Sequence, residues 1–258
     1  MADNLFEIKN LSFSYDKDNV IDDLSLTIKP GGVTTIIGAN GCGKSTLFNL
    51  MTKNLKYDKG EIKFLGEDIS KIKLRALAKK LAIVHQQNTI PFDITVEKLV
   101  GYGRIPYENL CIPSKQEDNE DKIIWAMSVT GVYDIKGELL SRLSGGQRQR
   151  AWIAMSLAQD TDTLLLDEPT TFLDIKHQIE ILKLIENLNK EHGISIIMVL
   201  HDMNQAMRYS TEVIALKDGK NIAQGPPESV ISEELLKNLY GVDLDIVEVN
   251  GKPFVYMA

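Results

Sequence analysis

The segment from Gly38 to Thr46, G-A-N-G-C-G-K-S-T, constrains this chain more than any other stretch of its sequence. It fits the pattern G-x-x-x-x-G-K-[ST], with a run typical of a buried strand before it (V-T-T-I-I) and the first turns of a helix after it (L-F-N-L-M). A glycine loop between a strand and a helix indicates a phosphate site, because its backbone N–H groups surround phosphate oxygens at the positive end of the helix dipole. This context disfavours the alternative, a glycine-rich turn that contains a lysine by chance.

Side chains within the segment suit a magnesium nucleotide. Lys44 can reach the β- and γ-phosphates, and the Ser45 hydroxyl is placed to ligate Mg²⁺. The residues expected to line the nucleotide are Gly38, Asn40, Gly41, Cys42, Gly43, Lys44, Ser45 and Thr46.

Composition narrows the class of protein. The chain has 258 residues, is 43% hydrophobic and 25% charged, and carries a net charge of -7, which argues against nucleic acid as its main partner. It has no apolar run long enough to span a membrane, and its start, M-A-D-N-L-F-E, does not predict a signal peptide. Cys42 and Cys111 do not suggest a disulfide framework, so we expect a protein of the reducing cytoplasm. The four histidines lack zinc-ligand spacing, so the sequence does not predict a zinc site.

The remaining sequence predicts an α/β fold with a parallel sheet and two additions. The first thirty residues alternate between apolar and polar side chains, which is typical of an antiparallel strand pair. Pro91 to Gln159 shows helical patterns and almost no strand signal, which indicates an inserted helical subdomain. Thr163 to Glu168 and Ile194 to Leu200 are apolar without alternation, as parallel strands buried on both faces are.

Further elements follow from local signals. Helices are expected over Lys71–Lys80, Thr95–Gly103, Ser114–Gly131, Ser144–Asp160, Asp174–Glu191 and Ser232–Tyr240, a strand over Leu81–Gln86, and hairpins over Lys59–Ile69, Glu212–Gly225 and Asp245–Met257.

Polar groups stand at the ends of the predicted strands, where an open parallel sheet binds its ligands. We expect Asp167 to hold Mg²⁺ through water alongside Ser45, and Glu168 to polarise the attacking water as general base. Gln86 would lie beside the metal and sense the γ-phosphate, and His201 would hydrogen-bond that phosphate. Each residue alone is compatible with an ordinary strand end. Their joint order along the chain predicts hydrolysis of a magnesium nucleotide.

A second glycine-rich helix start, L-S-G-G-Q-R-Q-R from Leu143 to Arg150, does not fit a self-sufficient site. Ser144 can cap the helix, and the N–H groups of Gly145 and Gly146 suit an oxyanion. The alternative is a helix that merely begins with glycines. The Gly38–Thr46 loop already binds the phosphates from one side, so a second anion-binding helix start would be redundant unless it faces a nucleotide held by another chain.

Taken together, these motifs resemble the ATP-binding subunits of ABC transporters. The glycine loop, L-S-G-G-Q, L-L-L-D-E-P-T, T-F-L-D from Thr171 to Asp174, and His201 occur in that family's order and spacing. The resemblance covers essentially the whole chain. It implies a P-loop NTPase core over 1–90 and 160–225, which includes an N-terminal antiparallel β-subdomain, a helical subdomain over 91–159, and a C-terminal helix and hairpin over 226–258.

The resemblance also implies a shared site. Two copies would stack head to tail, so that each ATP lies between Gly38–Thr46 of one chain and the signature of the other, with Asp174 at the seam. The signature residues are Ser144, Gly145, Gly146 and Gln147. From the strand pattern, Tyr15 is read first as a half-buried aromatic, but it falls where the family stacks a ring on adenine. Gln86 falls on the family's glutamine loop, although His85 stands where proline is common.

A narrower resemblance concerns the ATPases of iron-siderophore, haem and cobalamin importers. It rests on D-E-P-T-T-F-L-D-I-K-H-Q (Asp167 to Gln178) and I-T-V-E-K-L-V-G-Y-G-R (Ile94 to Arg104). Such subunits work with two membrane permeases, which the segment Gln87 to Thr95 would meet, and indirectly with an extracytoplasmic binding protein. The chain would then lie peripherally on the inner face of the cell membrane.

Two rival classes remain. A soluble ABC ATPase acting on ribosomes or DNA is disfavoured by the single cassette, the absence of long coiled-coil patterns and the acidic charge. A nucleotide-binding regulator without turnover is disfavoured by Lys44, Glu168 and His201.

Overall fold

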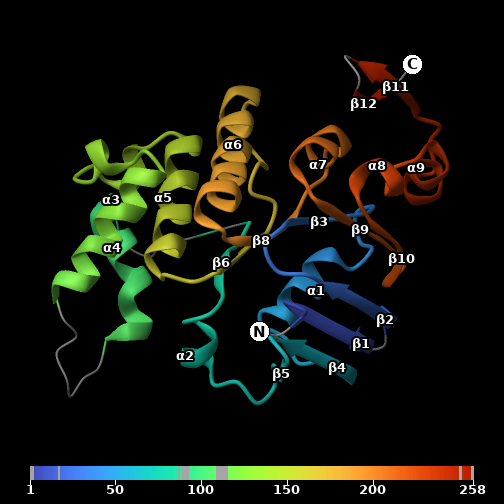
Figure 1. Ribbon diagram of the computed structural model, residues 1–258, viewed down its shortest axis with the longest axis horizontal. Helices are drawn as coiled ribbons and strands as arrows, with labels where there is room; N and C mark the ends of the chain where they lie inside the picture. The colour runs from blue at the N-terminus through green and yellow to red at the C-terminus, as the bar shows by residue number, and fades with distance from the viewer. Residues whose placement is uncertain are drawn as a thin grey trace. The chain divides into compact units, whose positions relative to one another are not determined.

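The computed structural model describes residues 3–16, 18–86, 88, 93–108, 116–249 and 252–256 (Figure 1). The chain forms two compact units. The first comprises Met1–Ile72 and Ser195–Ala258, and the second comprises Lys73–Ile194. The subdomain bounds expected from the sequence follow its motifs, whereas these two units follow the contacts between residues. The expected bounds therefore stay a prediction.

An antiparallel sheet forms one part of the first unit, in the order β2-β1-β4-β5. Residues Phe6 and Ile8 are buried, and the Phe6 ring lies 4.9 Å from that of Phe64 on the neighbouring strand. The first thirty residues therefore form the predicted strand pair. The hairpin predicted over Lys59–Ile69 extends the same sheet. The bounds are β1 Phe6–Tyr15, β2 Asp18–Ile28, β4 Lys59–Phe64 and β5 Glu67–Asp68.

The strand before the glycine loop, β3 Val33–Ile37, lies between two parallel neighbours in the same unit. These are β8 Ser195–Val199 and β9 Glu212–Lys217, and β10 Lys220–Gly225 pairs antiparallel with β9. All five residues of β3 and of β8 are buried, which explains why neither sequence alternates between apolar and charged side chains. Parallel strands beside the glycine loop are confirmed.

Helices and a terminal hairpin complete the first unit. Helix α1 Lys44–Met51 follows the glycine loop, and α9 Glu233–Tyr240 is capped by Ser232 as its sequence predicts. The predicted C-terminal hairpin forms from β11 Asp245–Val249 and β12 Lys252–Tyr256, and its predicted turn residues lie outside the described ones. Two short helices were not predicted, α7 Met203–Tyr209 and α8 Pro227–Val230.

The second unit combines a parallel strand pair with helices. Strand β6 Ala82–Val84 pairs with β7 Thr163–Leu166, so the residues that follow both strands lie at the same edge. Helices α3, α4 and α5 contact one another, as the predicted helical subdomain requires (Figure 1). The helices of this unit are α2 Leu74–Leu77, α3 Val96–Gly101, α4 Gln116–Val129, α5 Gly145–Ala158 and α6 Ile175–His192, with short 3-10 helices at Tyr102–Tyr107, Tyr133–Ile135 and Leu140–Arg142.

The predicted helix over Lys71–Lys80 is shorter in the structure. The Asp68 carboxylate accepts hydrogen bonds from the backbone N–H and the hydroxyl of Ser70, at 2.9 and 2.7 Å, and Lys73 is extended. A local side-chain turn thus competes with the first helical turn, and α2 begins only at Leu74.

Candidate nucleotide site

The glycine loop has a backbone that only glycine accommodates easily. Gly38, Gly41 and Gly43 have φ of 152°, 81° and 104°. A Cβ at Gly38 would lie 2.3 Å from the Leu216 oxygen, and one at Gly43 would lie 2.8 Å from Ile21. Positive φ therefore favours glycine at all three positions, and close contacts also require it at Gly38 and Gly43. No side chain caps helix α1 at Gly43, so its first N–H groups face the loop rather than a capping oxygen.

Lys44 lies inside the loop to which it belongs. The residue is 5% exposed, and its Nζ donates to the backbone oxygens of Gly38 and Ala39, both at 2.8 Å. The ammonium is thus held where the loop curls, as a phosphate-binding lysine must be. Ser45 is exposed at the first turn of α1, whereas Thr46 is buried beneath the loop.

Burial raises the pKa of two groups at the loop, Cys42 within it and Tyr240 of α9 in the same unit. Cys42 is buried, and burial raises the pKa of its thiol, so it stays protonated at neutral pH. Burial raises the pKa of Tyr240, at the end of α9, to about 12, and a backbone hydrogen bond from Gly38 opposes that rise. The loop therefore rests on the C-terminal helix, a contact that no local sequence signal indicates.

His201 lies at the same sheet edge as the loop. It follows β8, which pairs in parallel with β3 through Ile36 and Val199. His201 is exposed, and Asp202 beside it caps helix α7 by accepting from the Gln205 N–H at 2.9 Å. The sequence prediction that strand ends bring these two motifs to one edge is confirmed within the first unit.

Tyr15 ends β1 as a half-buried aromatic, as its strand pattern predicts, with 49% relative accessibility, and packs edge-on against Phe13 with ring centroids 4.8 Å apart. Its role on adenine stays a prediction.

In the second unit, Gln86 and Glu168 meet beyond the ends of β6 and β7. The Gln86 amide donates to Glu168 Oε2, and the Thr171 hydroxyl donates to the same oxygen at 3.0 Å. Glu168 itself has a φ of 50°, a left-handed conformation that non-glycine residues adopt rarely. Two donors and an unusual backbone therefore orient the carboxylate expected to act as general base. Sequence reasoning did not assign a role to Thr171.

Asp167 precedes this pair and is 8% exposed. Its backbone N–H donates to the Val84 oxygen at 2.9 Å, which continues the strand pairing to the carboxylate. Within the second unit, the Asp167 carboxylate and the Gln86 amide supply hard oxygen donors of the kind that Mg²⁺ prefers. Within the described residues, no cluster of three or more His, Cys, Asp or Glu side chains forms a metal cage. This donor set fits Mg²⁺, which is usually held by one or two protein groups together with substrate phosphates.

The signature segment begins helix α5 with a capping box. The Ser144 hydroxyl accepts from the Gln147 N–H at 3.3 Å, and the Gln147 side chain accepts from the Ser144 N–H at 3.0 Å. Ser144 is the helix cap, as predicted.

Asp174 begins helix α6 in the same unit as the signature. Its carboxylate caps the helix by accepting from the His177 N–H at 3.0 Å, and a further contact joins its second oxygen to the His177 ring at 2.8 Å. Leu173 lies next to Gly145, where a Cβ would approach it to 3.2 Å. The segment that ends at Asp174 therefore packs on the start of the signature helix.

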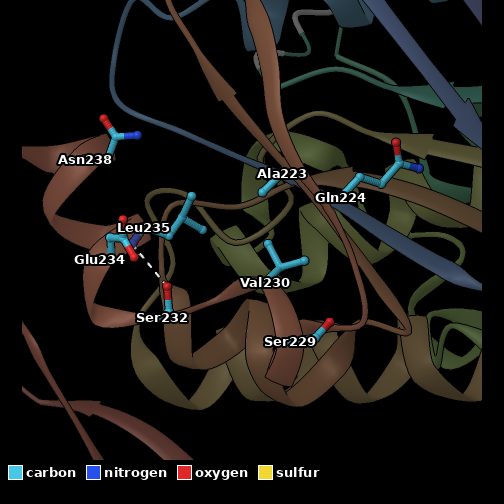
Figure 2. A pocket seen from close by; sticks show the side chains of 8 residues that line it. All are labelled: Ala223, Gln224, Ser229, Val230, Ser232, Glu234, Leu235 and Asn238. Atoms are coloured by element: carbon cyan, nitrogen blue, oxygen red, sulfur yellow. Dashed lines mark hydrogen bonds between the residues drawn. The ribbon is translucent and has the colours of Figure 1, made fainter.

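A separate hollow of about 370 Å³ lies in the C-terminal part of the first unit (Figure 2). Ser232 there accepts from the Leu235 N–H at 3.1 Å, and Glu234 also lines the wall. A lining with a carboxylate and no basic side chain does not suit phosphate, so this hollow is not a second nucleotide site. Its other lining residues are Ala223, Gln224, Ser229, Val230 and Asn238.

The glycine loop with its buried lysine, the oriented glutamate and the capped signature are the features of a P-loop nucleoside triphosphatase with an ABC signature. The sequence profile of the ABC transporter family matches residues 21–171. The chain belongs to the ABC transporter family, as an ATP-binding subunit with ATPase chemistry.

Relatives with assigned roles match nearly the whole chain. It is 43% identical over 250 residues to the petrobactin import ATP-binding protein FpuC of Bacillus anthracis, covering 97% of this chain and 92% of that protein. It is 43% identical to the ferric enterobactin transport ATP-binding protein FepC of Escherichia coli, covering 96% and 92%. The iron(3+)-hydroxamate import ATP-binding protein FhuC of Bacillus subtilis is 42% identical, with coverage of 95% and 90%.

Solved structures share the fold. An inward-facing metal-chelate type ABC transporter matches with a TM-score of 0.84 at 25% identity, covering 98% of this chain and 96% of that one. A dimeric ATP-binding cassette bound to ADP and phosphate matches with a TM-score of 0.74 at 28% identity, covering 86% and 98%. Among the residues that the structure describes, no helix has the length and apolar character needed to cross a membrane.

Proposed function

We propose that this ATPase powers import of a ferric siderophore through separate membrane permeases, from a peripheral position on the inner face of the cell membrane. The observation that carries the proposal is the set of siderophore-import relatives above, which are 42–43% identical over at least 95% of this chain. An extracytoplasmic binding protein would deliver the cargo. No residue assigned above would touch that cargo, so its chemistry is inferred from these relatives.

Two copies of the chain would assemble head to tail around two ATP molecules. Ser144 and Gln147 form a capping box that fixes the start of α5, where the N–H groups of Gly145 and Gly146 suit an oxyanion, and this supports a surface that completes another chain's site. Beside Asp174, the apolar side chains of Phe172 and Ile175 are 86% and 76% exposed. An exposed apolar surface next to the Asp174 carboxylate, which caps α6, supports a contact with the second copy.

Within each site, the residues would divide the work by their chemistry. The loop amides and Lys44 would bind the phosphates, and Ser45, Asp167 and Gln86 would hold Mg²⁺, which stabilises charge on the transferring phosphate. Glu168, oriented by Gln86 and Thr171, would take the proton of the attacking water. His201 would hydrogen-bond the γ-phosphate, and Tyr15 would stack on adenine.

Cargo is tested by uptake in the host that carries this chain. A strain lacking the chain should lose uptake of ⁵⁵Fe-labelled petrobactin, enterobactin or hydroxamate complexes, wild type should restore it, and Glu168→Gln should not. Uptake of all three complexes equal to that of the parent strain would contradict siderophore import. A growth or translation defect with normal iron uptake would favour the soluble class acting on ribosomes or DNA.

A further inference from the structure

His177 joins two segments that the proposed function assigns to the seam between copies. It lies one turn into helix α6, where its backbone N–H donates to Asp174 Oδ1 at 3.0 Å and its ring Nδ1 lies 2.8 Å from Asp174 Oδ2. One residue thus engages both oxygens of the carboxylate. The ring is partly buried, with its side chain 26% exposed, whereas the Asp174 side chain is 65% exposed.

The other side of the same ring lies against the signature. A Cβ at Gly146 would lie 2.3 Å from His177 Cδ2 and 2.7 Å from its Cγ, closer than such atoms approach in proteins. Gly146 is helical and does not have a positive φ, so its backbone does not require glycine. The ring of His177 requires it instead.

A second contact keeps the two helices together one turn further on. Arg150 of α5 forms an ion pair with Glu180 of α6, and both side chains are partly buried. The His177–Gly146 and Arg150–Glu180 contacts follow each other along both helices. They fix the start of the signature helix relative to the start of α6.

We propose that His177 is a positioning residue that makes the Asp174 carboxylate and the signature Ser144–Gln147 move as one unit. This inference rests on the proposed shared site. The ring, as a donor at Nδ1, sets the direction of the carboxylate, and its bulk sets the position of the helix that presents Ser144. Both groups then reach the partner's nucleotide in one fixed arrangement, which matters because misplacement by about 1 Å can lower a rate by about 100-fold.

The alternative is that His177 serves only folding, as part of the α6 cap. The two roles are separable because the capping hydrogen bond comes from the backbone N–H, which every variant at 177 other than proline keeps. His177→Ala removes ring and donor, His177→Leu keeps bulk without the donor, and His177→Asn keeps a donor near the Nδ1 position. Lys176→Ala, at the exposed neighbouring position, is the matched control.

The test measures kcat, the KM for ATP, nucleotide affinity of the monomer and Tm for each variant. His177→Ala and His177→Leu should lower kcat at least about tenfold with monomer nucleotide affinity unchanged, and His177→Asn should recover most of kcat. Lys176→Ala should match wild type. Turnover of His177→Ala within about twofold of wild type, or loss of kcat in His177→Asn equal to that in His177→Ala, would overturn the proposal.

A stability cycle tests the contact itself, without activity. Gly146→Ala should lower Tm more in the wild-type background, where the new methyl group meets the ring, than in the His177→Ala background, where only the Cβ of residue 177 remains, 3.0 Å away. An equal fall in Tm in both backgrounds would contradict the contact between Gly146 and the His177 ring. Failure of the proposed shared site can be told apart from failure of the His177 proposal. If the shared site is wrong, turnover per chain of the wild type is independent of protein concentration, regardless of the result for the His177 variants.

Discussion

At the scale of single residues, Glu168 is the side chain that we propose as the general base of ATP hydrolysis. Gln86 and Thr171 both donate to its Oε2, and its φ of 50° costs on the order of 1–3 kcal/mol. A conformation of that cost persists only where the surroundings enforce it. The arrangement fixes the carboxylate before nucleotide arrives, as a general base requires.

Glu168→Gln should therefore keep ATP binding and lower kcat by about 10²- to 10⁴-fold, because an amide retains the two contacts and cannot take a proton. Single-turnover hydrolysis and equilibrium binding of a fluorescent ATP analogue measure the two effects separately. Glu191→Gln, an exposed change on α6, is the control. Hydrolysis by Glu168→Gln within tenfold of wild type would remove the assignment.

Tyr240 supplies a pH dependence. Its pKa is raised from 10.0 to about 12 by burial, so the folded chain favours the neutral phenol. This contribution to stability is complete below pH 10 and is lost as pH rises from 10 towards 12. Compared with Tyr240→Phe, wild type should lose stability over that window, as measured by urea unfolding at pH 9, 10 and 11. Parallel curves for both proteins would contradict the assignment.

The sequence predicts residues whose roles are local and misses those whose roles depend on tertiary contact. The glycines, Lys44 and the Ser144 cap follow from short-range backbone chemistry, and the structure places them as expected. Tyr240 at Gly38 and His177 at Gly146 join segments that are distant in sequence or lie on different helices. Only the spacing of Asp174 and His177, three residues apart at a helix start, gives a signal that a local reading can use.

At the scale of elements, the C-terminal hairpin is fastened to the helix that follows His201. Asn204 of α7 donates to the Val255 oxygen at 3.0 Å, and the Val255 N–H donates back to the Asn204 side chain at 2.7 Å. An isolated two-stranded hairpin is marginally stable in water. These two hydrogen bonds therefore anchor β12, and the Ile246 N–H, which donates to Glu233 Oε1 at 3.1 Å, adds a third contact from β11.

Asn204→Ala should release the hairpin, with a local loss of about 1–3 kcal/mol from two hydrogen bonds. Hydrogen exchange over 245–249 and 252–256 should accelerate while exchange in β3 stays slow. Asn238→Ala, which removes only an exposed contact with Lys217, provides the control. Unchanged protection of the hairpin in Asn204→Ala would show that other contacts hold it.

Among elements, long patterned segments were predictable and short ones were not. Helix α6 and the strands β3, β7 and β8 have uniform apolar or amphipathic sequences, and they form within a few residues of their expected bounds. Helix α7 has seven residues, too few for a periodic signal. Asp202 and Gln205, at capping-box spacing, were the one local indication of its start.

At the scale of the whole molecule, each of the two compact units carries some of the groups that we propose for hydrolysis. The first carries the phosphate loop and His201, and the second carries Asp167, Glu168 and the signature. The signature has its own capped helix start, and the apolar side chains of Phe172 and Ile175 stand exposed beside Asp174. We infer that this surface of the second unit completes the ATP site of a second copy.

The most direct test is the molar mass of Glu168→Gln in solution, by light scattering, with and without ATP. Without ATP the mass should be that of one chain, 28.9 kDa, and with ATP it should double, because unhydrolysed ATP joins two copies. Adding Ser144→Arg to Glu168→Gln should prevent the doubling without preventing ATP binding by the monomer. A mass that stays at 28.9 kDa with ATP bound would contradict the shared site.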